Sequence, residues 1–319
     1  MSLLRMLQSY IPERSQDEYF LMENARKILP QLSFEELNHE ILKQLTKEHG
    51  IEMSSAIFFT KLIDNSKSSK FIDLLNQTKV NFSSLPKFDG EVWILPAGFY
   101  RDIPEFDGDG ELIRKIGTHF GLKSRLIELD PKGTISANSE IIIEELSKDT
   151  PENLFLFSIS KGTADLRIAL EKKPELQSKI KSWVSIGGLF KNNPLADKVL
   201  NKNTISLLLQ KTVLQILGIP MEFISEFSSK TGILKDEVNI IVKNQINVIA
   251  VPLPSHMQGN ILKRYKILAH HGPNDGYSLL LDSSLPSGLI YPIWGTDHYF
   301  RSSLLNDCIY KVFYYLSKL

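Results

Sequence analysis

Residues 153–163 read NLFLFSISKGT, and this stretch indicates the fold of the chain. Its apolar run, 154–157, has the length and composition typical of a strand that is buried on both faces of a parallel sheet. The following residues, 163–173, carry Leu166 and Leu170 at helical spacing, with charged side chains on the opposite face. A buried strand is therefore predicted to run directly into a helix.

The joint between strand and helix, Ser158-Ile-Ser160-Lys-Gly162, contains the S-x-G half of the G-x-S-x-G nucleophile elbow. Ser158 stands where the first glycine of that motif would be. Such a turn lifts the hydroxyl of the middle serine above the carboxyl ends of the strands, beside the helix N-terminus. Backbone N–H groups at that point can stabilise an oxyanion. Ser160 is therefore the candidate nucleophile.

Strand and helix patterns alternate on both sides of this joint. The apolar strand patterns are 92–95, 124–129, 182–187, 246–253, 265–271 and 288–295, and helical patterns at 110–121 and 138–148 separate the earlier ones. Alternation of this kind indicates right-handed crossovers and a mostly parallel sheet with helices on both faces, which is an α/β fold. In an open sheet of this class the site lies beyond the carboxyl ends of the strands.

The N-terminal region, residues 1–87, reads as helices by its apolar periodicity and includes a capping box, SFEE, at 33–36. A turn-rich stretch, PKFDG at 86–90, marks the start of the main domain, 88–319. Two interpretations of the helical region stay open. It is either an appendage that packs on the main domain or extends its substrate cleft, or a separate module that binds a protein partner.

A helical insertion, residues 196–245, interrupts the strand and helix alternation of the main domain. Within it, residues 205–224 are apolar almost all round. This segment fits two interpretations equally well. It is either a lid whose inner face meets an acyl chain or a helix buried between domains.

A serine hydroxyl is a weak nucleophile until an adjacent base removes its proton. Of the seven histidines, His298 is the best candidate for that base. It lies in GTDHYF (295–300), directly after the last apolar strand pattern, where a loop could return its imidazole to the elbow. The remaining histidines are less suitable. Three lie in helical patterns, His39, His49 and His119; His256 lies in a loop; His270 and His271 end the strand pattern 265–271.

A third group must orient the base, and a carboxylate is the usual choice. Asp275 fits because the sequence GPNDG (272–276) forms a tight turn that would aim its side chain. Asp282 is the reserve candidate. Asp297 is disfavoured because it neighbours the base, and adjacent side chains of an extended segment diverge.

From about residue 88 to the C-terminus the chain resembles the α/β-hydrolases. Its turn around Asp275, followed by His298, is similar to the pattern in bacterial lipases and esterases of that fold. The chain order of Ser160, Asp275 and His298 is also the order found in that family. The resemblance implies that Ser160 is the nucleophile, that His298 acts as general base and then acid, and that Asp275 fixes the tautomer of the base.

The resemblance also implies an oxyanion hole made by two backbone donors. One donor is the N–H of Lys161, the residue after the nucleophile. The other should come from the loop after the first core strand, LPAGFY at 95–100. In this loop Phe99 is our first choice and Gly98 the second.

The composition of the chain indicates which partners it is not expected to bind and in which compartment it works. Lys plus Arg and Asp plus Glu both number 37, so no net field favours nucleic acid or an anionic membrane. The single cysteine, Cys308, lies in an apolar helical pattern and is expected to be a core residue in a reducing compartment. Neither a signal peptide nor an integral membrane segment is expected. The chain is therefore predicted to be cytoplasmic.

No cofactor and no metal are expected. The sequence contains no Walker glycine loop and no G-x-G-x-x-G spacing. The stretch DGDGE at 107–111 lacks the ligand spacing of a calcium loop and is interpreted as a solvated turn.

Together these features predict a serine hydrolase that cleaves a carboxylic ester. A lipid-like ester is one option, because residues 205–224 would provide an apolar wall. Thioesterases, amidases and acyltransferases use the same residues and are alternatives. The rival from another class is a non-catalytic α/β-hydrolase scaffold whose helical N-terminal region binds a protein partner. The oligomeric state is left open.

Overall fold

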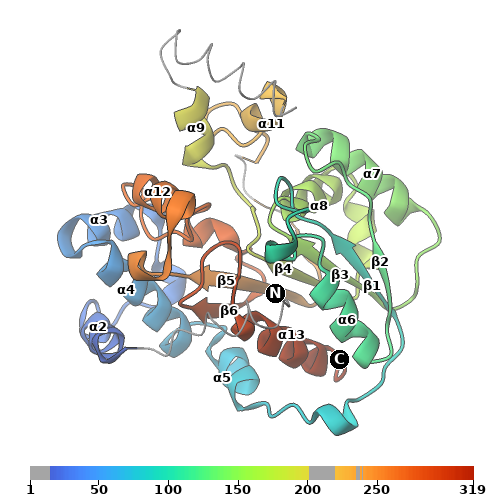
Figure 1. Cartoon of the computed structure of the whole chain (residues 1–319), viewed down its shortest axis with the longest axis horizontal. Coiled ribbons are helices and arrows are strands. Elements are labelled where there is room, and N and C mark those ends of the chain that lie inside the picture. Colours follow the sequence, from blue (N-terminus) through green and yellow to red (C-terminus); the bar gives the residue numbers. More distant parts are fainter. Residues whose placement is uncertain (1–14, 201–219, 235–237, 239) are drawn as a thin grey trace. The chain divides into compact units, whose positions relative to one another are not determined.

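The structure, a computed structural model, describes residues 15–200, 220–234, 238 and 240–319 (Figure 1). Its strands form one six-stranded sheet with the order β2-β1-β3-β4-β5-β6. The pairs β1–β2, β1–β3 and β3–β4 are all parallel. The predicted mostly parallel sheet is therefore confirmed. The strands are β1 (Glu91–Leu95), β2 (Lys123–Leu126), β3 (Leu154–Ile159), β4 (Ser182–Ile186), β5 (Gln245–Val251) and β6 (Leu289–Trp294).

The described helices occur in the N-terminal region and throughout the main domain. They are α2 (Gln16–Lys27), α3 (His39–His49), α4 (Ile51–Asp64), α5 (Ser69–Gln77), α6 (Glu111–His119), α7 (Ile135–Ser147), α8 (Lys161–Lys172), α9 (Pro194–Leu200), α11 (Met221–Ser225), α12 (Gly259–Leu268) and α13 (Ser303–Leu316).

The chain divides into two compact units, which we name by the candidate residues they contain. The elbow unit comprises residues 87–247 and 282–288 and contains Ser160. The histidine unit comprises the residues up to Pro86 together with 248–281 and 289–319, and it contains His298. The helical N-terminal region thus belongs to the same compact unit as the last part of the chain.

In the elbow unit, helices cover both faces of the sheet (Figure 1). Successive side chains of a strand point to opposite faces, so Trp93 and Leu95 of β1 lie on one side. These two residues share a hydrophobic core with α7 and α8. On the other side α6 packs along β1 and β2, and a Cβ built on Gly110, just before α6, would lie 2.8 Å from Ile94 Cγ2. This packing fixes the strand ends from which the candidate site is built.

In the histidine unit, helices α2 to α5 share one hydrophobic core with the last two strands. Ile249 and Val251 of β5 and Ile290 and Trp294 of β6 belong to this core. Helix α13 packs on α5, where the rings of Phe71 and Tyr315 meet edge to face with centroids 5.1 Å apart. The N-terminal helices therefore form part of a common core with β5 and β6.

The predicted capping box at Ser33 forms, but it precedes a short turn and not the helix itself. The Ser33 N–H donates to Glu36 Oε2 at 2.8 Å. The box closes a 3-10 turn, Phe34–Glu36. Helix α3 begins only at His39, where Asn38 Oδ1 accepts the N–H of Ile41 at 2.9 Å.

The strand predicted at 265–271 is wrong, because residues up to Leu268 belong to helix α12. Ile261, Tyr265 and Leu268 are buried at helical spacing, four and three residues apart. The helix begins at Gly259, where the φ of +62° suits a glycine. The apolar run was short enough to fit either element, so periodicity alone did not separate them.

The predicted insertion, 196–245, is described only at its two ends, because residues 201–219 lie outside the described chain. Most of the apolar segment 205–224 therefore also lies outside it, and α11 covers its last residues. One buried guanidinium joins the segment before the insertion to the described part near its end. Nη1 of Arg167, on α8, donates to the carbonyl oxygens of Phe190 and, at 3.0 Å, of Leu234.

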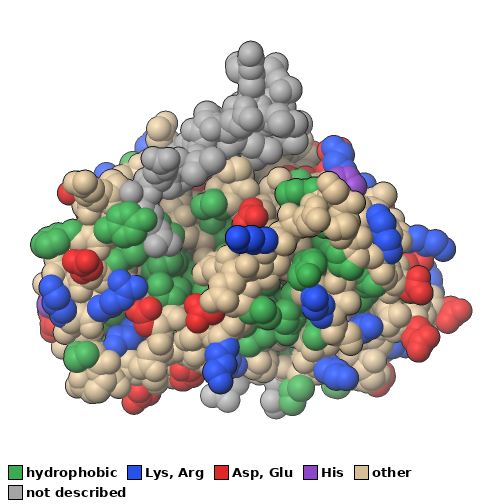
Figure 2. Space-filling model, turned by 90° about the horizontal axis from the view of Figure 1, so that it is seen from below, with side chains coloured by type: hydrophobic (Ala, Val, Ile, Leu, Met, Phe, Trp, Pro, Cys, Tyr) green, Lys and Arg blue, Asp and Glu red, His purple; other side chains and the backbone are tan. Residues whose placement is uncertain are grey.

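On the face drawn in Figure 2, basic and acidic side chains are interspersed among apolar and polar ones. This distribution agrees with the equal numbers of positive and negative side chains in the sequence, 37 of each. Across the described residues, the structure contains no helix that is both long and apolar enough to span a bilayer.

Candidate active site

Ser160 occupies the junction between β3 and α8 in a conformation that few serines adopt. Its φ of 49° and ψ of −113° lie outside the ordinary helical and extended regions. A residue held in this way costs about 1–3 kcal/mol and persists only where the surroundings determine it. Here they do, because the Ser160 N–H donates to Ile186 O at 3.0 Å, and the Ser160 carbonyl accepts the N–H of Leu189 at 3.3 Å. The end of β4 therefore fixes the turn.

Gly162 allows the start of α8 to approach β1 closely. A Cβ at this position would lie 2.4 Å from Leu95 O and 2.6 Å from Pro96 O. Both are backbone atoms that cannot move without shifting the loop after β1. The glycine of the S-x-G motif is therefore required by close packing.

Ser158, in the place of the first motif glycine, has a role that the sequence did not reveal. Its hydroxyl accepts the indole N–H of Trp183 at 2.8 Å and lies 2.8 Å from the Thr163 hydroxyl. All three residues are fully buried. Ser158 thus joins β3, β4 and α8 below the elbow.

The predicted oxyanion residues lie together in the elbow unit. Lys161 is the first residue of α8, and the first N–H groups of a helix have no intrahelical acceptor. Gly98 lies in the loop after β1, where a built Cβ would be 3.0 Å from Lys161 Cδ and 3.4 Å from Lys161 Cβ. The adjacent residue, Phe99, is partly exposed. The loop after β1 therefore lies directly against the elbow.

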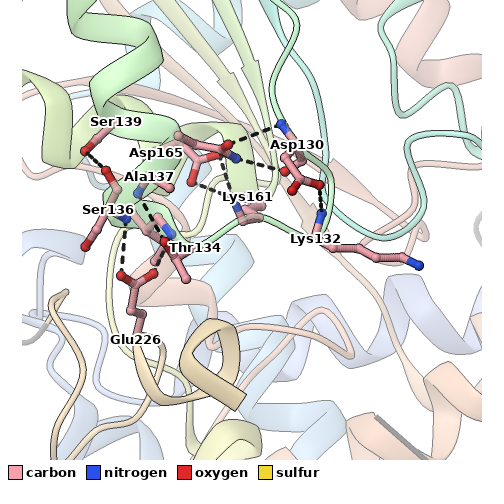
Figure 3. Close-up of polar contacts among 11 residues, drawn as sticks. Asp130, Lys132, Thr134, Ser136, Ala137, Ser139, Lys161, Asp165 and Glu226 are labelled. Carbon is pink, nitrogen blue, oxygen red and sulfur yellow. Dashed lines mark hydrogen bonds and ion pairs between the residues drawn. The ribbon is translucent and has the colours of Figure 1, made fainter. Parts of the chain in front are cut away.

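The side chain of Lys161 enters a buried polar network (Figure 3). Its Nζ lies 2.7 Å and 2.8 Å from the two carboxylate oxygens of Asp165, one turn further along α8. Asn138 Nδ2, from α7, also donates to Asp165 Oδ2 at 3.0 Å. Burial raises the pKa of Asp165 to about 6, although Lys161 and Asn138 act in the opposite direction.

The described end of the insertion contacts the same residues. The ring of Phe223 lies 4.4 Å from the ring of Phe99, and Lys161 Nζ lies 5.6 Å above the Phe223 ring. Further along, the Glu226 carboxylate accepts the N–H groups of Ile135 and, at 3.2 Å, of Ser136 (Figure 3). A carboxylate is favourable at a helix N-terminus, so Glu226 ties this segment to the start of α7.

Asp275 and His298 form a buried pair in the histidine unit. His298 Nδ1 lies 2.7 Å from Asp275 Oδ2, and neither side chain is more than 1% exposed. The other oxygen, Oδ1, accepts the N–H groups of Tyr277 at 2.8 Å and Ser278 at 2.7 Å. An ionised carboxylate can only accept, so this contact favours the tautomer in which His298 Nδ1 donates to Asp275.

The other candidate carboxylates are held differently. Asp297 Oδ2 pairs with Arg301 at 2.6 Å, and Asp297 Oδ1 accepts the N–H of Tyr299 at 3.0 Å. Asp282 belongs to the elbow unit, where its Oδ1 lies 3.9 Å from Lys191 Nζ. The structure thus assembles two groups of predicted residues, each within one unit: Ser160 with Lys161, Gly98 and Phe99, and Asp275 with His298.

In the part of the chain that the structure describes, no cluster of three or more His, Cys, Asp and Glu residues is arranged to hold a metal ion. The acidic turn at 107–111 is tied internally. Asp107 Oδ1 accepts the N–H of Leu112 at 3.1 Å, and Asp109 pairs with Arg114 at 2.7 Å.

Comparison with known proteins places this geometry in a known fold. No protein-family model matches the sequence, and no curated protein matches it. A metagenomic carboxyl esterase of solved structure is 18% identical, with a TM-score of 0.58 over 76% of this chain and 79% of that one. The mature form of a Bacillus licheniformis lipase is 15% identical, with a TM-score of 0.55 over 75% of this chain and 96% of that one. These likenesses show that the chain has the α/β-hydrolase fold, as its sequence predicted.

Proposed function

We propose that the chain is a serine hydrolase that cleaves carboxylic esters with Ser160, Asp275 and His298 as its catalytic triad. The backbone of Ser160 is the observation that carries the proposal, because strain at the start of a buried helix is typical of a functional residue. The buried Asp275–His298 pair supplies an oriented base. A carboxyl esterase and a lipase among the similar structures support ester hydrolysis as the reaction.

In the proposed mechanism the Ser160 hydroxyl oxygen attacks the ester carbonyl carbon while His298 Nε2 takes its proton. The carbonyl oxygen becomes an oxyanion, which accepts the N–H of Lys161 and that of Phe99, with Gly98 as the second choice. The imidazolium then gives its proton to the leaving alkoxide as the C–O bond breaks. Water then attacks the acyl carbon while His298 takes its proton, and as the bond between the acyl carbon and the Ser160 oxygen breaks, the imidazolium of His298 gives that proton to the Ser160 oxygen and the carboxylic acid is released.

Asp275 holds the imidazole in the tautomer that this sequence of steps needs. Its second oxygen is occupied by the N–H groups of Tyr277 and Ser278, which prevents the carboxylate from rotating away from His298. It also stabilises the imidazolium that forms in each transition state.

For the substrate we propose only a chemical class. A lipid-like ester is the option that agrees with the apolar insertion and with the aromatic rings of Phe99 and Phe223 beside Lys161. Thioesters, amides and acyl transfer to another hydroxyl would use the same residues. The substrate is therefore proposed as a small or lipid-like carboxylic ester.

The test is turnover of p-nitrophenyl esters from acetyl to palmitoyl by the full chain and by Ser160→Ala. We expect wild-type turnover that falls by at least about 10³-fold in the variant, and a fluorophosphonate probe that labels only the wild type. Labelling without turnover would indicate a different acyl donor. Absence of both would overturn the proposal in favour of a non-catalytic scaffold that binds a protein partner.

A further inference from the structure

We propose that Asp165 is a positioning residue of the oxyanion hole, which it serves by fixing the side chain of Lys161 against the loop that contains Gly98 and Phe99. The inference rests on the proposed function, because it concerns the oxyanion of the same reaction. Asp165 acts through Lys161 and has no contact with the reacting atoms in this scheme.

The Lys161 ammonium depends on Asp165 for its position. The Lys161 side chain is 4% exposed and that of Asp165 is 1% exposed, and Nζ bonds to both carboxylate oxygens. A buried ammonium that loses its partner is strongly unfavourable and moves toward water. Lys161 is the residue that follows the nucleophile, so such a movement would begin at the donor of the oxyanion hole.

The aliphatic stem of Lys161 connects the two sides of the oxyanion hole. It covers Gly98 so closely that a Cβ there would lie 3.0 Å from Lys161 Cδ. The same lysine lies beneath the Phe223 ring, which itself packs on Phe99. If the ammonium moved, the loop after β1 would lose the side chain on which it rests, and the spacing of the two N–H donors would change.

Asn138 prevents Asp165 from following the lysine. Its Nδ2 donates to Asp165 Oδ2 and to Asp130 O, both at 3.0 Å, and its Oδ1 accepts the Asp130 N–H at 3.2 Å. The carboxylate is therefore anchored to α7 and to the loop before it. The pKa of Asp165, raised by burial to about 6, leaves it ionised in an assay at pH 8.

The experiment compares Asp165→Asn with wild type at pH 8 on an ester and on its thionoester, in which sulfur replaces the carbonyl oxygen. Sulfur is a poorer hydrogen-bond acceptor, so the ratio of the two kcat values reports on the oxyanion donors. We expect a fall of about 10- to 100-fold in kcat for the ester, a KM within about 3-fold of wild type, and a lower ester-to-thionoester ratio.

A neutral double variant, Lys161→Met/Asp165→Asn, provides the matched control. It contains no unpaired ammonium that would move toward solvent, and the methionine side chain still covers Gly98. We expect its ester-to-thionoester ratio to return toward that of wild type. A double variant as impaired as the single one would overturn the proposal, because the loss would then not come from the movement of an unpaired ammonium.

Other outcomes also decide the proposal. If Asp165→Asn does not fold, Asn138→Ala takes its place, and we expect a change in the same direction of about 3- to 10-fold. An unchanged ratio in a folded variant would overturn the positioning role alone. Absence of Ser160-dependent turnover in the wild type would overturn the proposed function and this inference with it.

Discussion

The elbow and the Asp275–His298 pair are held in place by different kinds of interaction. At the elbow the determinants are backbone atoms: the strained φ of Ser160, its hydrogen bonds to β4, and the carbonyl oxygens that crowd Gly162. At the pair they are mainly polar contacts of one carboxylate, which accepts two backbone N–H groups and lies 2.7 Å from the imidazole, together with one backbone hydrogen bond from the His298 N–H to Asp275 O.

The difference predicts how each region responds to substitution. Loss of a polar contact at the pair alters the orientation of a side chain and leaves the backbone in place. An added atom at the elbow forces backbone to move. Substitutions that remove a polar contact at the pair should therefore reduce activity and leave stability unchanged. Substitutions that add an atom at the elbow should reduce both stability and activity.

The largest effect is expected for Asp275→Asn. The amide keeps the shape of the carboxylate, but it presents a donor or a neutral acceptor to His298 and no longer fixes the required tautomer. We expect kcat to fall by roughly 10³- to 10⁴-fold, with a thermal midpoint close to that of wild type. Steady-state kinetics and thermal unfolding of the same preparation measure both quantities.

Asp297→Asn is the matched control for this prediction. It also changes one carboxylate oxygen beside His298, but what it weakens is the ion pair with Arg301, and we expect kcat within about 3-fold of wild type. A large loss in Asp297→Asn or in Asp282→Asn, with near-normal Asp275→Asn, would transfer the orienting role to that residue and end the comparison.

A smaller effect, on stability, is expected for Gly162→Ala. The new Cβ meets two backbone carbonyls, and we expect a loss of about 3 kcal/mol in the free energy of unfolding. The matched change at the turn is Gly276→Ala. Gly276 has a φ of +89°, and the added Cβ would lie 2.5 Å from the Ile261 side chain. That side chain can rotate, so strain of about 1–2 kcal/mol should remain.

Chemical denaturation of both variants, fitted with one common m-value, gives their free energies of unfolding. We expect Gly162→Ala to lose more free energy of unfolding than Gly276→Ala. Equal costs, or a larger cost at Gly276, would show that the turn is as rigidly determined by its backbone as the elbow.

Much of the fold was predictable because its signals are local. The run 154–157 and the strand patterns at 92–95 and 182–187 each correspond to one strand, and the small residues of the elbow are neighbours in the sequence. The pattern at 265–271 failed because apolar spacing in a short run fits both a strand and the end of a helix. Its buried positions in α12 depend on tertiary contacts that no local pattern contains.

The candidate site was predictable only in part, for a similar reason. A serine in an elbow and an aspartate in a tight turn have recognisable neighbours in sequence. Lys161 and Asp165 do not, since a lysine and an aspartate four residues apart on a helix are typical of a solvated ion pair. Their burial follows from the packing of α7 and of the loop after β1, so the contact between the Lys161 side chain and Asp165 emerged only from the structure.

The smallest effect is expected where the elbow does use a side-chain contact. Ser158→Ala leaves the buried indole N–H of Trp183 without the acceptor it has at 2.8 Å, which should cost about 1–2 kcal/mol of unfolding free energy. Thr163→Val removes the neighbouring hydroxyl but keeps that acceptor, so it should cost less. The backbone of Ser160 is unaffected in both, and kcat should stay within about 3-fold. A Ser158→Ala variant of normal stability but with kcat reduced more than about 10-fold would show that the elbow, like the pair, is oriented by polar side chains.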